Sequence, residues 1–348
     1  MFDSQTNLTS IDKWTLDTST ATDMTNMFYT CSNLIAVNLS GLNTSNAMSM
    51  SSMFSFCEKL TSLDLSNFNT SKVNNMSWMF YTCSSLTSLD LSSFDFSSVT
   101  DMSSMFMRCK TVTITGFAGK DIHSCTNINQ MFAECYALEN VDFTGVNFSS
   151  VTDMSGMFAD TSKIKSVSFK NADLSSVTDM SRMFFNQAGR LKTADFSGCD
   201  LSKVTDISSM FAFQTNLTAV NFGLNMDNVQ NADSAFLNCS SLRNFPRIRF
   251  AGDSVNISRL CAVAGGSGAM IGEIGNYPDI LGGTITSMDY AFANQPNMEM
   301  IGLSSNIGLT AAPTQAFAGC TGLEKVYTTQ AENEYILAAL NTDLPDKK

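Results

Sequence analysis

The sequence predicts an α/β repeat protein, a solenoid with short parallel strands and one short helix per 26-residue coil. A Met-Phe pair recurs at intervals of 26 residues, seven times running, from Met1-Phe2 to Met183-Phe184. A strict period of this length is typical of solenoids, in which equivalent residues of neighbouring coils stack on one another. Within each repeat the apolar residues also change from an extended spacing to a helical one.

Residues 86–109, LTSLDLSSFDFSSVTDMSSMFMRC, illustrate both spacings. The repeat opens on Leu86, Leu89 and Leu91, which have the pattern of a short strand. It ends on apolar residues that lie three or four apart, from Val99 to Cys109, as on one face of a helix. We therefore expect parallel strands about 4.8 Å apart, each followed by a short helix.

The spacing of the repeats loosens late in the chain and predicts three parts. Steps of 27, 25, 25, 31 and 25 residues follow Met183-Phe184. We expect a regular solenoid over residues 1–244 and irregular repeats with a Gly-rich insertion over residues 245–327. The insertion lacks the GxxxxGK and GxGxxG patterns of phosphate-binding loops. The segment AENEYILAALNT predicts an amphipathic capping helix, followed by a charged tail, within residues 328–348.

The repeat itself resembles a known family. The segment SLTSLDLSSFDFSSVTDMSSMF, residues 85–106, is similar to the repeat of the BspA-like leucine-rich repeat surface proteins of bacteria. The later segments DSAFLNCSSL and TQAFAGCTGL resemble the related treponemal-type leucine-rich repeat. The resemblance implies a curved leucine-rich-repeat-like solenoid, an extracellular or surface location, and a family associated with adhesion and host-protein binding. A parallel β-helix of similar coil length is the alternative architecture, which the helical spacing disfavours.

Charge and hydropathy argue against a nucleic-acid partner and against a membrane-spanning segment. The 348 residues include 32 Asp and Glu against 20 Lys and Arg, for a net charge of −12. An acidic surface repels phosphate backbones, so we expect no nucleic-acid partner. No apolar run approaches the length of a transmembrane helix, so we expect no membrane span. The first residues, MFDSQTNLTS, have neither the basic nor the apolar region of a signal peptide.

The ten cysteines raise the question of disulfides or a metal site. Cys31, Cys57, Cys83, Cys109 and Cys135 recur at intervals of 26 residues. Stacked equivalents have parallel Cβ vectors, which fit disulfide geometry poorly. The sequence also has no CxxC pair with a histidine partner, as a zinc site would require. We expect a row of buried, reduced, apolar thiols and no metal or other cofactor.

Carboxylates and one histidine are the candidates for chemistry. Asp64, Asp90 and Asp142 share one strand position and would face the concave side of the solenoid. This acidic strip either binds a cation or ligand, or forms a solvated polar face that neighbouring Ser and Asn residues hydrogen-bond. A hydrolase would need an enclosed pocket and a base, which an open solenoid face does not offer. The single histidine, His123, has no matched Ser or Cys partner, so we expect no enzyme.

A few bulky side chains interrupt positions that hold Ser, Ala or Gly in most repeats. They are Tyr29, Trp78, Tyr81, Met107 and Arg108. Exposed aromatic residues beside an arginine are typical of binding hot spots, so we expect a binding site on Trp78, Tyr81 and Met107 with the other two at its rim. Partial burial against neighbouring loops is the alternative.

Two functions of different classes remain. The first is a non-enzymatic recognition solenoid that binds a protein or glycan as a surface or adhesion module. The second is a structural subunit of a virion or other large assembly. There the uncapped first coil, at Met1-Phe2, would dock on a neighbour and form a homo-oligomer or a larger assembly.

Overall fold

The computed structural model describes residues 1–110, 113–186, 189–222, 226–243, 245–246, 248–264, 268, 279–328 and 333–345. The chain forms two compact units, Met1–Val177 and Thr178–Lys348. Each is a parallel β-solenoid, as the sequence predicts, in which neighbouring coils are joined by short strands and single bridges. The two units are described separately below.

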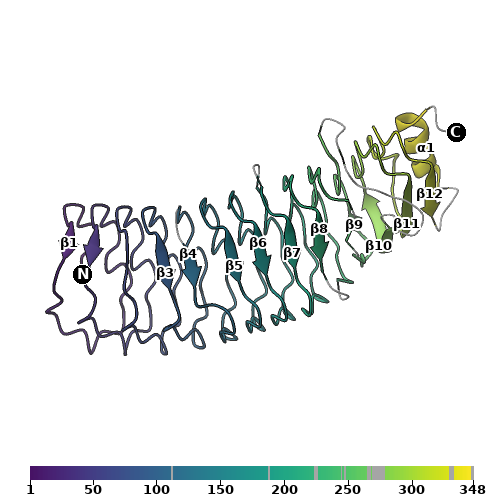
Figure 1. Cartoon of the computed structure of the whole chain (residues 1–348). Coiled ribbons are helices and arrows are strands. Elements are labelled where there is room, and N and C mark those ends of the chain that lie inside the picture. Colours follow the sequence, from purple (N-terminus) through teal and green to yellow (C-terminus); the bar gives the residue numbers. More distant parts are fainter. Residues whose placement is uncertain are drawn as a thin grey trace. The chain divides into compact units, whose positions relative to one another are not determined.

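The N-terminal unit carries strands of two or three residues (Figure 1). They are β1 (Ser10–Ile11), β2 (Ala36–Val37), β3 (Ser88–Asp90), β4 (Thr113–Thr115), β5 (Asn140–Asp142) and β6 (Ser166–Ser168). The registers of the parallel pairs equal the sequence period or fall one residue short of it, since Asn140 lies opposite Ser166 in β5 and β6, and Ser88 lies opposite Thr113 in β3 and β4. A second ladder of parallel bridges joins the same coils and runs from Asp23 to Asp153 in steps of one repeat.

The C-terminal unit has longer strands and the α-helix. Its elements are β7 (Thr193–Asp195), β8 (Ala219–Asn221), β9 (Val255–Asn256), β10 (Asp279–Ser287), β11 (Met300–Ile307), β12 (Lys325–Thr328) and α1 (Glu334–Asp343). Strands β9 to β12 form one parallel sheet in the order β12-β11-β10-β9 (Figure 1). Most of the predicted Gly-rich insertion lies outside the described residues, and the three predicted domain boundaries stay predictions.

The capping helix is found where the sequence predicts it. Asn333 caps its N-terminus, because the Oδ1 atom of Asn333 accepts hydrogen bonds from Tyr335 N and Ile336 N, each at 3.2 Å. Ile336 and Ala339 are buried on one face of the helix. Asp343, in the last turn, accepts a hydrogen bond from the backbone of a repeat at Phe317 N. The helix is thus fixed to the last coils by both apolar and polar contacts.

The prediction of a short helix in every coil is wrong, because turns occupy these segments instead. Among the described residues α1 is the single α-helix. Met79 N donates to Met76 O at 3.3 Å and closes a turn, whereas Phe80 N donates to Met105 O of the next coil at 2.9 Å. An α-helix would keep both donors within its own segment. Turns of three residues give the same apolar spacing as a helical face, which explains the wrong prediction.

The Met-Phe pairs form the core. The rings of Phe28, Phe54, Phe80 and Phe106 stack on one another at centroid distances of 5.2–5.7 Å and interplanar angles of 8° or less. All four side chains are fully buried. Each ring therefore contacts its equivalents in the two neighbouring coils, so the stability of a coil depends on its neighbours.

The cysteine column lies beside this core and supplies hydrogen-bond donors. All ten cysteines are free and buried. The Sγ atom of Cys83 donates to the carbonyl oxygen of Phe54, in the preceding coil, at 3.1 Å. Thr161 occupies the equivalent position of its coil, and its hydroxyl donates to Phe132 O at 2.8 Å. The remaining thiols that make this bond are Cys31, Cys57, Cys109, Cys135, Cys239 and Cys320.

Candidate recognition surface

One edge of each coil is made by the residues around the Met-Phe pair. We call this the turn edge, and it consists of the residue before the pair and the two residues after it. In the coil of Met79 these residues are Trp78, Tyr81 and Thr82. The first and third positions adopt left-handed φ angles, with φ 60° at Trp78 and 58° at Thr82. Other coils of the N-terminal unit fill the first position with Asn26, Ser52, Ser104, Gln130 and Gly156.

Four aromatic rings run along the turn edge of the N-terminal unit. The rings of Tyr29 and Phe56 meet edge to face at a centroid distance of 5.6 Å. Phe56 meets Tyr81 in the same way at 5.1 Å, and Trp78 packs against Tyr81 at 4.7 Å. Edge-to-face packing is a favoured arrangement for aromatic side chains. These four residues form a continuous row, which we call the aromatic row.

An arginine and a glutamate end the aromatic row. Arg108 Nη1 donates to the Tyr81 hydroxyl at 3.0 Å, and the guanidinium carbon lies 5.8 Å from the centre of the Tyr81 ring. Arg108 Nε donates to both carboxylate oxygens of Glu134 at 3.1 Å. These bonds raise the pKa of Arg108 above its ordinary value. The Tyr136 hydroxyl donates to Glu134 Oε2 at 2.8 Å, and burial, followed by this hydrogen bond, raises the pKa of Tyr136 to about 12.

The structure brings together most of the residues that the sequence singles out. Trp78 has 41% of its surface exposed, whereas Tyr81, in the same row, is buried with 9% exposed. Tyr29 and Met107 are half-buried and Arg108 is exposed. Tyr29 reaches the others only through a ring in the coil between them, and the sequence reasoning missed that ring.

That missing ring is Phe56, at the third position of the turn edge. Glu134 occupies the same position and was also missed, although it is the ion-pair partner of Arg108. The signal in the sequence was the residue type, because Phe56 stands at a position that is threonine in both neighbouring coils, Thr30 and Thr82. The φ angle of 60°, an outlier for a phenylalanine, is visible only in the structure.

The carboxylates of the acidic strip accept hydrogen bonds from nearby backbone N–H groups. The Oδ1 atoms of Asp64 and Asp90 accept hydrogen bonds from Ser66 N at 3.0 Å and Ser92 N at 2.9 Å. Asp142 makes the same turn, accepting from the backbone N–H two residues on at 2.9 Å. The serine hydroxyls and N–H groups hold the pKa values of Asp64 and Asp90 below the ordinary value. In the part of the chain that the structure describes, no group of three or more His, Cys, Asp or Glu residues is arranged to hold a metal ion.

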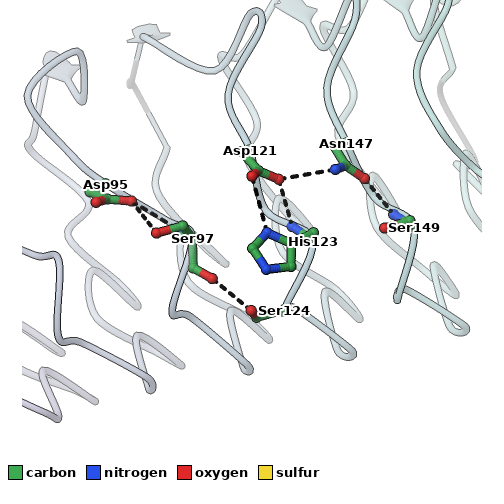
Figure 2. Close-up of polar contacts among 7 residues, drawn as sticks. All are labelled: Asp95, Ser97, Asp121, His123, Ser124, Asn147 and Ser149. Atoms are coloured by element: carbon green, nitrogen blue, oxygen red, sulfur yellow. Dashed lines mark hydrogen bonds and ion pairs between the residues drawn. The ribbon is translucent and has the colours of Figure 1, made fainter.

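The same turn recurs at another corner of the coils, where His123 lies (Figure 2). Asp121 accepts from His123 N at 3.2 Å and from the side-chain amide of Asn147 at 3.1 Å, and its other oxygen lies 3.0 Å from His123 Nδ1. The imidazole is about half exposed. The nearby hydroxyls of Ser97 and Ser124 donate to Asp95 and to a backbone carbonyl. This arrangement stabilises a corner and activates no serine.

Comparison with known families agrees with this architecture. The profile of the family described as "Mycoplasma protein of unknown function, DUF285" matches residues 1–117 and 121–247. The profile described as "BspA type Leucine rich repeat region (6 copies)" matches residues 280–339. No curated protein matches the chain. Among the described residues, no helix is long and apolar enough to cross a membrane.

One solved structure shows the same fold, and two further ones have a weaker similarity to the chain. A leucine-rich repeat protein from Bacteroides ovatus is 16% identical, with a TM-score of 0.54 over 93% of this chain and 80% of that one. A leucine-rich repeat protein of Leptospira interrogans is 11% identical, with a TM-score of 0.29 over 91% and 84% of the two chains. A plant peptide hormone receptor solved in complex with its hormone is 13% identical, with a TM-score of 0.28 over 85% and 56%.

Proposed function

The chain is a BspA-like leucine-rich repeat protein of the DUF285 family, and we propose that it is a non-enzymatic recognition module whose aromatic row binds a protein or glycan. Leucine-rich repeat solenoids are interaction modules, which supports binding as the general class of activity. A surface or adhesion role, outside the cell, is part of the same proposal and is supported by the match to the BspA-type repeat.

The observation that carries the proposal is the backbone conformation of the exposed Trp78. A bulky residue at a left-handed φ angle costs free energy, on the order of 1–3 kcal/mol. Trp78 occupies a position that is Asn26 two coils earlier, and asparagine adopts the left-handed φ angle at a lower cost. The side chain that causes this strain is also 41% exposed, so folding gains less from it than from a buried ring. Strained, exposed aromatic residues are typical of functional sites.

The variant Trp78→Asn tests the proposal. Asn favours the left-handed φ angle, so we expect the variant to unfold at the same urea concentration as the native chain or a higher one. Binding should weaken by roughly thirtyfold or more, because aromatic anchors contribute about 2 kcal/mol or more each. The measurement uses a panel of purified glycans and immobilised host extracellular proteins. The affinity of each panel member that binds the native chain is then compared with its affinity for the Trp78→Asn variant.

Ser52→Asn is the matched control, because Ser52 has the same place in its coil and a φ of 55°. This control should bind like the native chain. If a panel member binds the native chain and Trp78→Asn equally, the aromatic row is not the site. If Asp90→Asn removes binding instead, the concave acidic strip is the site, because Asn keeps the turn but loses the charge.

A further inference from the structure

The C-terminal unit contains a pocket on its own turn edge, separate from the aromatic row. Its walls are Arg259 and Tyr290, which occupy the first turn-edge position of neighbouring coils. The guanidinium carbon of Arg259 lies 5.7 Å from the centre of the Tyr290 ring. The floor is formed by Ala262, Val263 and Ala293, all of them buried. The pocket has a volume of about 270 Å³.

The pocket has an apolar floor because two successive coils carry alanine at the second turn-edge position, as several other coils do, beside the large side chains of Arg259 and Tyr290. Ala262 and Ala293 hold the second turn-edge position, which is Leu237 in the preceding coil and Tyr81 or Met107 in the N-terminal unit. The Asn294 side chain fixes the floor, since its Nδ2 atom donates to Val263 O at 2.7 Å. Small side chains between two large ones thus leave an open apolar slot on the turn edge.

Arg259 is the one charged residue among the described residues that line the pocket. Its nearest carboxylate is that of Asp233, with Arg259 Nη1 and Asp233 Oδ1 at 3.9 Å, which is longer than a hydrogen bond. In contrast, Arg108 donates to both oxygens of Glu134. The Arg259 side chain is also 51% exposed. Its guanidinium donors are therefore available to an anion in a way that those of Arg108 are not.

Both walls carry large side chains at a position that is left-handed in other coils as well, such as at Arg182. Arg259 has φ 51° and Tyr290 has φ 58°, so two large residues in succession adopt the left-handed conformation. Asn or Gly would adopt it at lower cost. Strain of this kind is retained at ligand sites more often than elsewhere. The cation and the ring are thus placed together at a cost in stability.

We propose that this pocket binds the C-terminal residue of a peptide, with its carboxylate on Arg259 and an apolar side chain on the alanine floor beside Tyr290. A carboxylate matches the fork of guanidinium donors. The floor favours a peptide over an acidic sugar, because the hydroxyls of a sugar would lie unpaired on Ala262 and Ala293. This site extends the proposed function and does not depend on the aromatic row.

The test titrates three probes into the full chain at low salt. They are N-acetyl-Gly-Ser-Leu with a free carboxylate, the same peptide with a C-terminal amide, and N-acetylneuraminic acid. Binding is followed by calorimetry and by saturation-transfer NMR of the probe. We expect the free peptide to bind with a millimolar or lower dissociation constant and the amide at least about tenfold more weakly. The sugar should bind more weakly than the free peptide.

Two variants and a control locate the site. Arg259→Gln should weaken the free peptide at least about tenfold and should leave the weak binding of the amide unchanged. Ala262→Leu should block both peptides while the chain stays folded, because leucine is native at this position in the preceding coil. Arg249→Gln, an arginine of the same unit outside the pocket, should bind like the native chain.

Several results would overturn the proposal. Equal binding of the peptide acid and amide would remove the role of the carboxylate. Tighter binding of the sugar would mean that the site is for acidic glycans. No binding of the free peptide up to roughly 10 mM would mean that the slot is not a peptide site. Full binding by Arg259→Gln would place the peptide elsewhere, even if Ala262→Leu fails to fold.

Discussion

At the scale of single residues, the position four residues after each Met needs a buried hydrogen-bond donor. Cys83 and Thr161 both supply it, and the amide Nε2 of Gln214 donates to Phe184 O at 2.5 Å in the C-terminal unit. Three chemically different side chains thus perform the same task. The sequence predicted the burial of the thiols, but it could not show the bond, because cysteine resembles a small apolar residue in any pattern.

Replacement of Cys83 tests this requirement. Phe54 O also accepts from Cys57 N at 3.1 Å, so Cys83→Ala removes the second of two bonds to that carbonyl as well as some burial. We expect a loss of about 1–2 kcal/mol in the free energy of unfolding, measured in urea. Cys83→Thr should lose less, as Thr161 indicates. If threonine costs as much as alanine, the hydrogen bond is not the reason for the column.

The thiols of this column are also chemically protected. Burial raises the pKa of Cys57 and that of Cys109 to about 12. The thiolate is the reactive form of cysteine, and at neutral pH almost none is present at such a pKa. Disulfide exchange and metal binding both require the thiolate, so the geometry and the electrostatics of the column agree on a structural role.

At the scale of elements, the corners of the coils depend on carboxylates. Asp17, Asp64 and Asp90 have pKa values lowered by hydrogen bonds that each accepts from a serine two residues on. The pKa of Asp95 is lowered in the same way, by the side chain and then the backbone of Ser97. Asn38 makes the same turn without a charge, accepting from Ser40 N at 3.0 Å. The turn therefore needs the oxygen acceptor, and the charge strengthens it.

These shifts predict loss of stability in acid. A carboxylate whose pKa is lower in the folded state than in the unfolded state stabilises the fold above the unfolded value of 3.8. That contribution is lost as the pH falls through the lowered pKa values. We expect the melting temperature to hold between pH 7 and about pH 5 and to fall steeply below about pH 4.

The control for this prediction replaces aspartates by asparagine at the corners. A variant with Asp64→Asn, Asp90→Asn and Asp95→Asn keeps the acceptors and has no group to protonate at these three turns. Its melting temperature should fall less between pH 5 and pH 3 than that of the native chain. An equal fall in both chains would assign the acid sensitivity to other carboxylates.

The strands were predictable from the sequence and the per-coil helices were not. Leu86, Leu89 and Leu91 alternate as the strand pattern requires, and β3 is found at Ser88–Asp90. The segment that follows has a helical spacing, but its N–H groups alternate between its own turns and the next coil. Nothing in one repeat shows where such donors go, because the acceptor belongs to another coil. The left-handed φ angles of Ser104 and Arg108, which are incompatible with an α-helix, are visible only in the structure.

The residues of the candidate site were likewise predicted only in part. Trp78 and Tyr81 were predicted to be neighbours because residues three apart lie on one face of a helix. In the structure a turn brings the two side chains together instead. Phe56 and Glu134 were missed because contacts between coils depend on the exact edge position, which the helical interpretation assigned wrongly. The order in which equivalent residues stack could be predicted from the repeat period. The direction of each side chain could not, because it depends on the backbone conformation of the turn.

At the scale of the whole molecule, the alternative function as a subunit that assembles through its first coil stays a prediction. Leu16 is 46% exposed, whereas Leu42, one repeat later, is 2% exposed. Phe2 nevertheless stacks on Phe28 at 5.4 Å, so the coil packs on its neighbour as the others do. Leu16 is therefore exposed in a coil whose phenylalanine packs as its equivalents do.

The last prediction concerns how a solenoid unfolds. Phe80 is fully buried and stacks on Phe54 at 5.7 Å and on Phe106 at 5.5 Å. Phe80→Ala should therefore lower the free energy of unfolding by about 3–5 kcal/mol, through lost burial and a cavity. Because each coil contacts mainly its two neighbours, the damage should stay local and divide the urea transition into two steps.

Hydrogen exchange gives the direct measurement of that locality. In Phe80→Ala, the backbone amides of the neighbouring coils, such as Phe54 N and Phe106 N, should exchange faster, whereas Phe211 N in the C-terminal unit should keep its native rate. Trp78→Ala in the same coil is the control, because the Trp78 side chain is 41% exposed and loses less burial than the fully buried Phe80. A change below about 1 kcal/mol for Phe80→Ala, or uniform acceleration in both units, would contradict a core built from neighbour contacts.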